Sequence, residues 1–204
     1  MTDIEEIEQR VVKVQHGFRE MHTVAETIVK ENTPSQALKL AEELYASDKH
    51  QVRMVAVFVL GFIASKSEEA LKILHETVSK DASWQVHEIL AQAFNQYCKT
   101  IGYEKTLPTI KAWLKDKNPN VRRAASEGPR IWNQRPYFKE HPEVAVQLLS
   151  QLKDDESEYV RRSAGNALRD ISRKEKELVR KELATWNKSD QKIASTYALA
   201  SKFL

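Results

Sequence analysis

The chain has 204 residues, of which 41% are apolar and 30% are charged, enough apolar side chain for a core and too much for a disordered segment. Its 32 Lys and Arg residues against 29 Asp and Glu residues give a formal net charge of +3, which does not by itself identify a partner. The single cysteine, Cys98, excludes an intrachain disulfide and a cysteine-based zinc site.

The first 33 residues precede any repeat and are predicted to form one or two capping helices. They start with the acidic segment MTDIEEIEQR, which lacks the apolar stretch of a secretory signal. The longest apolar run follows later, at residues 54–64, and is too short to span a bilayer. We therefore expect a cytoplasmic protein that has no contact with membranes.

Five copies of one pattern follow, each a polar turn, often with Asp, then an apolar anchor, a basic residue and a small-apolar helix. The anchors are spaced 34, 35, 39 and 33 residues apart: Val52, Val86, Val121, Val160 and Ile193. An amphipathic helix is predicted before each anchor, over residues 35–47, 68–80, 106–116, 142–154 and 174–186. Two helices per repeat at this period predict an α-solenoid, and the residue pattern resembles HEAT repeats.

The predicted fold is all-α, a single domain over residues 1–204 with five HEAT-like repeats in residues 34–204. In the first repeat, Met54, Val57 and Phe58 are apolar on a face that is polar in later repeats. We expect the N-terminal segment to cover them, with five apolar residues: Ile4, Ile7, Val11, Val12 and Phe18.

On a helical wheel, residues seven and eleven positions after each anchor share its buried side, which assigns Trp132 to the core. Trp113 and Trp186 on the first helices are also assigned to the core. The opposite face of the middle repeats is polar and carries the candidate site residues: Trp84, Glu88, Arg123, Glu127, Arg130, Arg162, Asn166 and Arg169. Because the second helices of a solenoid line its concave side, we predict that these side chains point into one groove.

Arginines along a concave wall suit a phosphate backbone, because the guanidinium group is a fork-shaped donor with a fixed charge. The alternative is a solvated face, with Arg123 paired to Glu127 at i, i+4. The basic residues next to the anchors are interpreted as structural, each bonding the preceding Asp turn: Arg53, His87, Arg122, Arg161 and Lys192.

Glu88 lies one helical turn after Trp84 on the same predicted face. A carboxylate there can stabilise a cationic sugar in a transition state or position a water molecule, and the alternative is a solvated acid. Trp84 offers a π-face to a cationic base, or else packs at the start of its helix. The six histidines show no metal-ligand spacing, and the chain has no glycine-rich phosphate loop.

These residues resemble the HEAT-like DNA alkylation repair glycosylases of the AlkC and AlkD type over roughly residues 48–185. The segment VRRAASEGPR at Val121–Arg130 is similar to the AlkC-type R-R-x-x-S-E-G-x-R motif. The stretch SWQVHEILAQAF at Ser83–Phe94 resembles the family's active-site helix, which places its Trp and catalytic acid on Trp84 and Glu88. The family's active-site Arg falls on Arg123, and an AlkC-type groove acid falls on Glu127.

The resemblance implies a DNA glycosylase that excises cationic alkylated purines, with Glu88, Glu127 and Arg123 as catalytic residues. DNA contacts then fall to five residues: Trp84, Arg130, Arg162, Asn166 and Arg169. The partner is alkylated double-stranded DNA, no cofactor or metal is needed, and we expect a monomer, associated with the nucleoid if bacterial.

Two departures from the AlkD pattern keep other functions open: Asn166 stands where AlkD has a Trp, and Glu88 where it has an Asp. They favour a second hypothesis, a non-catalytic relative that binds damaged or branched DNA. A third hypothesis is a protein-binding HEAT scaffold, because a fold alone does not determine function.

Overall fold

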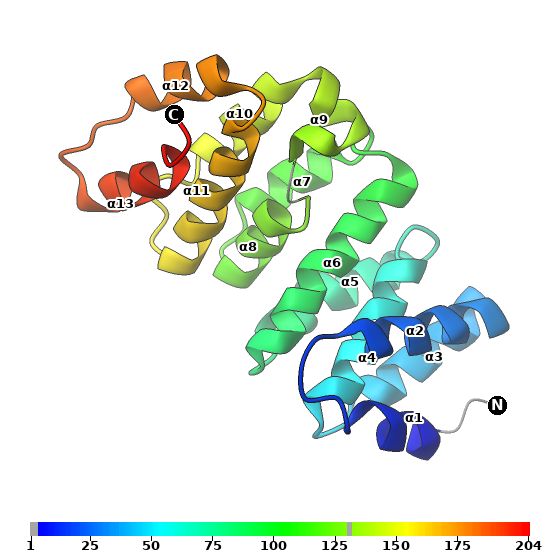
Figure 1. Ribbon diagram of the computed structural model, residues 1–204. Coiled ribbons are helices and arrows are strands. Elements are labelled where there is room, and N and C mark those ends of the chain that lie inside the picture. Colours follow the sequence, from blue (N-terminus) through cyan, green and yellow to red (C-terminus); the bar gives the residue numbers. More distant parts are fainter. Residues whose placement is uncertain (1–3, 130–131) are drawn as a thin grey trace. The chain divides into compact units, whose positions relative to one another are not determined.

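The structure is a computed structural model that describes residues 4–129 and 132–204 (Figure 1). Over these residues its regular elements are all helices, so the predicted all-α fold is confirmed. The chain divides into two compact units, Met1–Ile101 and Gly102–Leu204. The assignment of residues 1–204 to one domain stays a prediction.

The first unit contains two capping helices and two helical pairs. Its elements are α1 (Ile4–Val11), α2 (Arg19–Glu31), α3 (Pro34–Tyr45), α4 (His50–Ile63), α5 (Glu68–Glu76), a 3₁₀ turn (Val78–Lys80) and α6 (Trp84–Ile101). Helix α3 begins with a capping box, in which the Thr33 side chain accepts from the Gln36 backbone N–H and the Gln36 side chain accepts from the Thr33 backbone N–H. Pro34 at the first helical position favours the same start.

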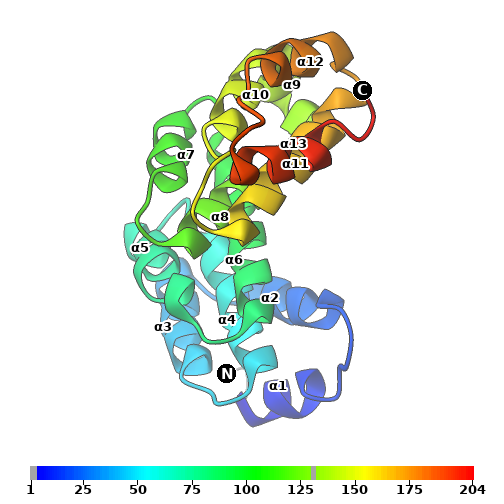
Figure 2. The same ribbon diagram turned by 90° about the vertical axis from the view of Figure 1, so that its left-hand side faces the viewer.

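Helix α4 is buried along most of its surface, because α2, α3 and α6 all pack against it and α1 contacts it as well (Figures 1 and 2). Met54, Val57 and Phe58 are each at most 4% exposed. The predicted cover is confirmed, and two of its residues, Ile7 and Val11, are buried. Val12 and Phe18 were expected in this cover but are exposed, although the Phe18 ring centroid lies 6.3 Å from that of Phe58.

The contact between α4 and α6 depends on a glycine. A Cβ atom at Gly61 would lie 2.6 Å from the Cα atom of Ala93, so only glycine fits at this approach. Gly61 is accordingly buried. The face of the first repeat that carries Met54, Val57 and Phe58 is covered by α1 and α2, as these apolar residues predicted.

The second unit contains three helical pairs and one additional short helix. Its elements are α7 (Leu107–Leu114), α8 (Pro119–Glu127), a 3₁₀ turn (Trp132–Gln134), α9 (Pro136–Glu140), α10 (Pro142–Ser150), α11 (Glu158–Ser172), α12 (Lys176–Ala184) and α13 (Gln191–Ala200). Helix α11 lies at the centre of this unit, packed against α8 on one side and α13 on the other (Figure 1). All five predicted anchors are buried, which confirms the repeat register in both units.

Helix α8 is shorter than the helical-wheel prediction required, because that prediction extended the helix to Trp132. It stops at Glu127, because Pro129 has no backbone N–H with which to continue the hydrogen-bond ladder. The wheel position of Trp132 therefore rested on a helix that does not reach it. The residue is nevertheless fully buried, and its indole N–H donates to the Ser126 carbonyl at 3.1 Å. The core assignments of Trp113 and Trp186 are also confirmed.

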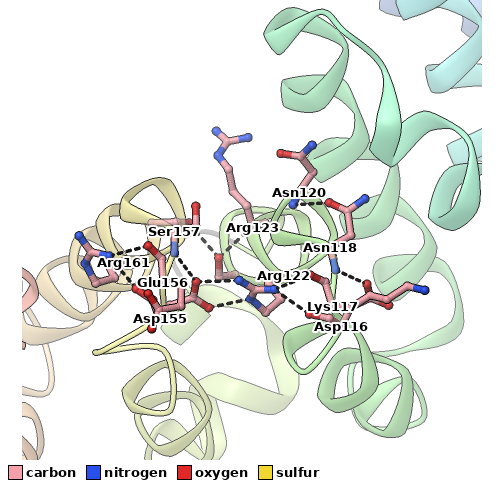
Figure 3. A network of polar contacts seen from close by, with 12 residues as sticks. Asp116, Lys117, Asn118, Asn120, Arg122, Arg123, Asp155, Glu156, Ser157 and Arg161 are labelled. Atoms are coloured by element: carbon pink, nitrogen blue, oxygen red, sulfur yellow. Dashed lines mark hydrogen bonds and ion pairs between the residues drawn. The ribbon is translucent and has the colours of Figure 1, made fainter. Parts of the chain in front are cut away.

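The turns of the repeats are joined by arginines in the position directly after the anchor. Arg122 donates from Nη1 to the carbonyls of Asp116 and Lys117 in its own turn, at 2.8 and 3.2 Å. Its Nε and Nη2 donate to the Asp155 carboxylate in the next repeat, at 2.6 and 2.7 Å (Figure 3). We call such a pair a turn rung.

Arg53 makes the same turn rung in the first unit. Its Nη1 donates to the carbonyls of Ser47 and Asp48, and its Nε and Nη2 donate to the Asp81 carboxylate at 2.8 and 3.0 Å. The structural interpretation of Arg53 and Arg122 is confirmed, because each arginine binds its own Asp turn through backbone carbonyls. In addition, each arginine binds an aspartate carboxylate of the following repeat.

Candidate functional site

Trp84 and Glu88 line one pocket of about 210 Å³ in the first unit. The pocket is formed by the N-terminal loop between α1 and α2, the start of α4 and the start of α6. Its lining comprises Val14, Gln15, His16, Gly17, Phe18, Met21, His50, Gln51, Met54, Trp84, Gln85 and Glu88. The structure therefore brings together the two predicted site residues of this unit.

The start of α6 fixes where Trp84 lies. The Asp81 carboxylate accepts the Ser83 backbone N–H at 2.7 Å, and the helix begins at the next residue. Trp84 is 61% exposed, which contradicts the alternative that it packs at the helix start. Because Glu88 is four residues further along α6, both side chains lie on the same helical face.

The pocket combines side chains suited to a flat, partly polar or cationic ligand. An indole face stands beside the Glu88 carboxylate, with the side-chain amides of Gln51 and Gln85 in the same lining. His50 adds a group that both donates and accepts hydrogen bonds. Phe18, Met21 and Met54 contribute the apolar part.

Sequence reasoning did not place the N-terminal loop at this site. The one residue in the sequence that could have indicated a turn in this loop is Gly17. Its φ is 79°, a value that other residues rarely adopt, and it allows the chain to turn between α1 and α2. Nothing in the spacing of His16, Gln51 and Gln85 indicated that they share a pocket. Among the described residues no cluster of metal-ligating side chains is present.

In the second unit, Arg123 projects from α8 beneath the side chain of Tyr159. Its guanidinium carbon lies 4.1 Å from the centroid of the Tyr159 ring, and the residue is 5% exposed. The alternative that Arg123 belongs to a solvated face is therefore wrong. A buried guanidinium over an aromatic face is held by cation–π attraction, which fixes its direction.

Glu127 lies one turn after Arg123 and contacts the neighbouring helix. The Ser163 hydroxyl on α11 donates to Glu127 Oε2 at 2.8 Å, and the Ser126 hydroxyl donates to Ser163 Oγ at 3.0 Å. Ser126 and Ser163 are both buried. This carboxylate is therefore oriented by the packing of α8 against α11.

Helix α11 carries the other three candidates of the second unit. Arg162 is exposed. Arg169 donates to the Asn166 side-chain oxygen at 3.0 Å and pairs with Asp170 at 3.1 Å. The Asp170 carboxylate offsets the charge of Arg169, which leaves Arg162 as the more accessible of the two cations.

The remaining predictions about the site are not tested by the described residues. Arg130 lies outside them. Glu88 belongs to the first unit, whereas Arg123, Glu127 and Arg162 belong to the second. Their convergence on one groove and their roles stay predictions. Within the described ranges, no helix is long and apolar enough to cross a membrane.

Comparison with known proteins gives one family and several related structures. The family model described as DNA alkylation repair enzyme matches residues 16–201. The chain is 48% identical to AlkD2 from Streptococcus mutans, whose crystal structure matches with a TM-score of 0.97 over 98% of this chain and 97% of that chain.

Two further matches cover only part of the related protein. The uncharacterized protein YhaZ of Bacillus subtilis is 28% identical over 91% of this chain, which spans 60% of that relative's length. The alkylpurine DNA glycosylase AlkC of Pseudomonas fluorescens, bound to DNA containing an abasic site analog, is 24% identical with a TM-score of 0.58. That match covers 97% of this chain and 60% of AlkC, and it shows a shared fold.

Proposed function

Because the chain belongs to the DNA alkylation repair enzyme family, we propose that it is a DNA glycosylase that excises cationic alkylated purines of the 3-methyladenine and 7-methylguanine type. The observation that supports this proposal best is the pocket in which the exposed Trp84 stands beside Glu88. An aromatic face next to a carboxylate matches the two positive charges of the reaction, one on the damaged base and one on the sugar.

The proposed reaction is hydrolysis of the N-glycosidic bond. A purine alkylated at N3 or N7 is already cationic, so the C1′–N bond breaks with its electron pair moving onto the base, which leaves as a neutral molecule. The sugar develops oxocarbenium character, and water adds to C1′ with loss of a proton. The products are the free base and an abasic site.

Each candidate residue has a role in this proposal. Glu88 stabilises the oxocarbenium charge and orients the water, Glu127 assists it, and Trp84 contacts the sugar or base. Such electrostatic stabilisation is worth about 3–4 kcal/mol for a well-placed group. Arg123 holds the DNA at the lesion, and the other backbone contacts fall to Arg130, Arg162, Asn166 and Arg169.

Base release from methylated duplex DNA tests the proposal. We expect wild-type protein to release 7-methylguanine or 3-methyladenine, and Glu88→Gln to slow release by about 100-fold, because it removes the negative charge while keeping the size of the side chain. Glu76→Gln, at an exposed carboxylate on α5 of the same unit, is the matched control and should retain activity. Full activity in the Glu88→Gln, Glu127→Gln double variant would reject the assignment.

A second candidate function is DNA binding in repair without base excision. Three observations favour it: Arg123 is buried against Tyr159, the Glu127 carboxylate accepts a hydrogen bond from Ser163, and Asn166 stands where AlkD has a Trp. All three reduce the number of groups available to a reacting nucleotide in the second unit.

The salt dependence of DNA affinity tests this second candidate. A protein that neutralises phosphates releases counterions, so the logarithm of its affinity falls linearly with the logarithm of salt concentration. Arg162→Gln should weaken binding and reduce that slope by about 1. Arg180→Gln on α12 is the control and should change neither value. Strong DNA binding without release of any base would select this candidate over the first.

A further inference from the structure

The pocket of Trp84 and Glu88 gathers the exposed aromatic surface of the first unit. In the described part of that unit, three large apolar side chains are exposed: Val12, Phe18 and Trp84. The two aromatic ones both line the pocket, Phe18 from the N-terminal loop and Trp84 from α6. Apolar side chains that stay in solvent inside a pocket indicate a ligand that covers them.

The size of the pocket limits the ligand to a single ring system. Its volume of about 210 Å³ is below the roughly 300 Å³ at which sites for drug-sized ligands begin. A nucleobase that has left the stack is flat, and aromatic side chains bind its face whatever its sequence. One base, rather than a whole nucleotide, therefore matches both the size of this pocket and its aromatic walls.

The Gln85 side chain determines which edge of a base the pocket accepts. Its Oε1 atom accepts a hydrogen bond from the Ser83 hydroxyl at 2.7 Å. The Ser83 backbone N–H is in turn bonded to the Asp81 carboxylate, so the amide oxygen of Gln85 is held at the start of α6. Since Gln85 lines the pocket, the group that it offers to a ligand is its Nε2 amino group, which only donates.

The two bases named in the proposed function differ where they would meet such a donor. 7-Methylguanine has an oxygen at C6, which accepts, whereas 3-methyladenine has an amino group there, which donates. An amide donor pairs with the oxygen and opposes the amino group. Because C6 and the glycosidic nitrogen lie at opposite ends of a purine, a base held at Gln85 leaves its sugar end for Glu88, one turn further along α6.

We propose that this pocket takes up a single damaged purine and that Gln85 selects 7-methylguanine over 3-methyladenine. Trp84 and Phe18 contact the ring, and Gln85 Nε2 donates to O6. The choice of these two ligands rests on the proposed function, but binding in the pocket requires no bond cleavage. A matched base edge is preferred over a mismatched one by about tenfold or more.

Quenching of tryptophan fluorescence by the free bases tests the pocket directly. The other three tryptophans, Trp113, Trp132 and Trp186, are at most 5% exposed, so a ligand in solution reaches Trp84. We expect saturable quenching by 7-methylguanine, with an affinity about tenfold higher than that of 3-methyladenine. Both free bases are neutral, so the ratio of their affinities does not depend on the charge of the pocket.

Gln85→Glu separates recognition of the base from a structural role of the side chain. It keeps the size of the side chain and replaces the amide donor by an acceptor, which pairs with the amino group of 3-methyladenine and repels O6 of 7-methylguanine. The preference should therefore reverse. Gln96→Glu makes the same charge change on α6 outside the pocket, and it should keep the wild-type preference.

Two results would overturn the inference. One is the absence of saturable quenching by either base, and the other is an unchanged preference in Gln85→Glu. Neither measurement involves DNA or base release. Base release without binding of the free bases would reject the pocket and leave the proposed glycosylase standing, whereas selective binding without base release would support the pocket and reject the glycosylase.

Discussion

At the scale of single residues, the structure separates arginines that look alike in the sequence. Arg122 and Arg123 are neighbours on α8, yet Arg122 joins two repeat turns and Arg123 lies under Tyr159. The repeat register predicted this separation, because the residue after the anchor and the next one point in different directions on a helix. It did not predict which carboxylate Arg122 binds, since Asp155 is 33 residues away in the sequence.

The turn rung of the first unit is expected to contribute measurably to stability. Asp81 binds Arg53 and also accepts from the Tyr45 hydroxyl at 2.9 Å. Asp81→Asn leaves the largely buried Arg53 without its charge partner, so we expect a loss of about 3 kcal/mol in the free energy of unfolding at pH 7. Chemical denaturation measures it, with Asp48→Asn at an exposed position as the control.

The same rung predicts how stability depends on pH. Burial raises the pKa of Asp81, but hydrogen bonds from Arg53, Ser83 and Tyr45 outweigh it and hold the pKa below its ordinary value. A carboxyl whose pKa is lower in the folded state stabilises the protein above its unfolded pKa of about 4, and this contribution is lost as the pH falls through the folded pKa. Wild type and Asp81→Asn should therefore converge in stability below about pH 4. A constant difference down to pH 2 would contradict this account.

At the scale of elements, α1 and α2 are part of the core of the first unit. Sequence reasoning predicted this cover from three apolar residues on the exposed face of one repeat, and the burial of Ile7 and Val11 agrees. It did not predict that the loop between α1 and α2 lines the pocket of Trp84 and Glu88. A loop leaves no periodic pattern in the sequence, so its position depends on the packing of the helices at its ends.

Two adjacent valines provide a matched test of the cover. Val11 is fully buried and Val12 is 36% exposed. Val11→Ala should lower the free energy of unfolding by about 2 kcal/mol, because it removes buried methyl groups and leaves a cavity. Val12→Ala should change it by less than about 0.5 kcal/mol. Equal effects in thermal denaturation would show that α1 does not pack as described.

The approach of α4 to α6 gives a second prediction at this scale. Gly61→Ala places a methyl group 2.6 Å from backbone and side-chain carbons of Ala93, so the two helices must move apart. We expect a net loss of about 1–3 kcal/mol, even though alanine favours a helix more than glycine does. Gly102→Ala, with a φ of 104° and no atom within 4 Å of the added Cβ, separates backbone strain from overlap. It should be destabilising without altering the packing of α4 on α6, as hydrogen exchange of α6 would show.

At the scale of the whole molecule, the repeat period predicted the helical pairs because each pair buries the same face against its neighbours. The sequence did not predict the end of α8 at Glu127, although Gly128 and Pro129 follow it directly. The helical wheel had been drawn as one continuous helix as far as Trp132. The catalytic interpretation came from the resemblance at Trp84, Glu88 and Arg123. Exposure of Trp84 supports it in the first unit, whereas burial of Arg123 was not foreseen, since a wheel gives direction and not the neighbours that cover a side chain.

The most direct test of the proposed glycosylase is release of 7-methylguanine from a methylated duplex under single-turnover conditions, with protein in excess over DNA. We expect release above the spontaneous rate in wild type and a decrease of about 100-fold in Glu88→Gln, with DNA affinity retained. Release at only the spontaneous rate by wild-type protein bound to the duplex would contradict it.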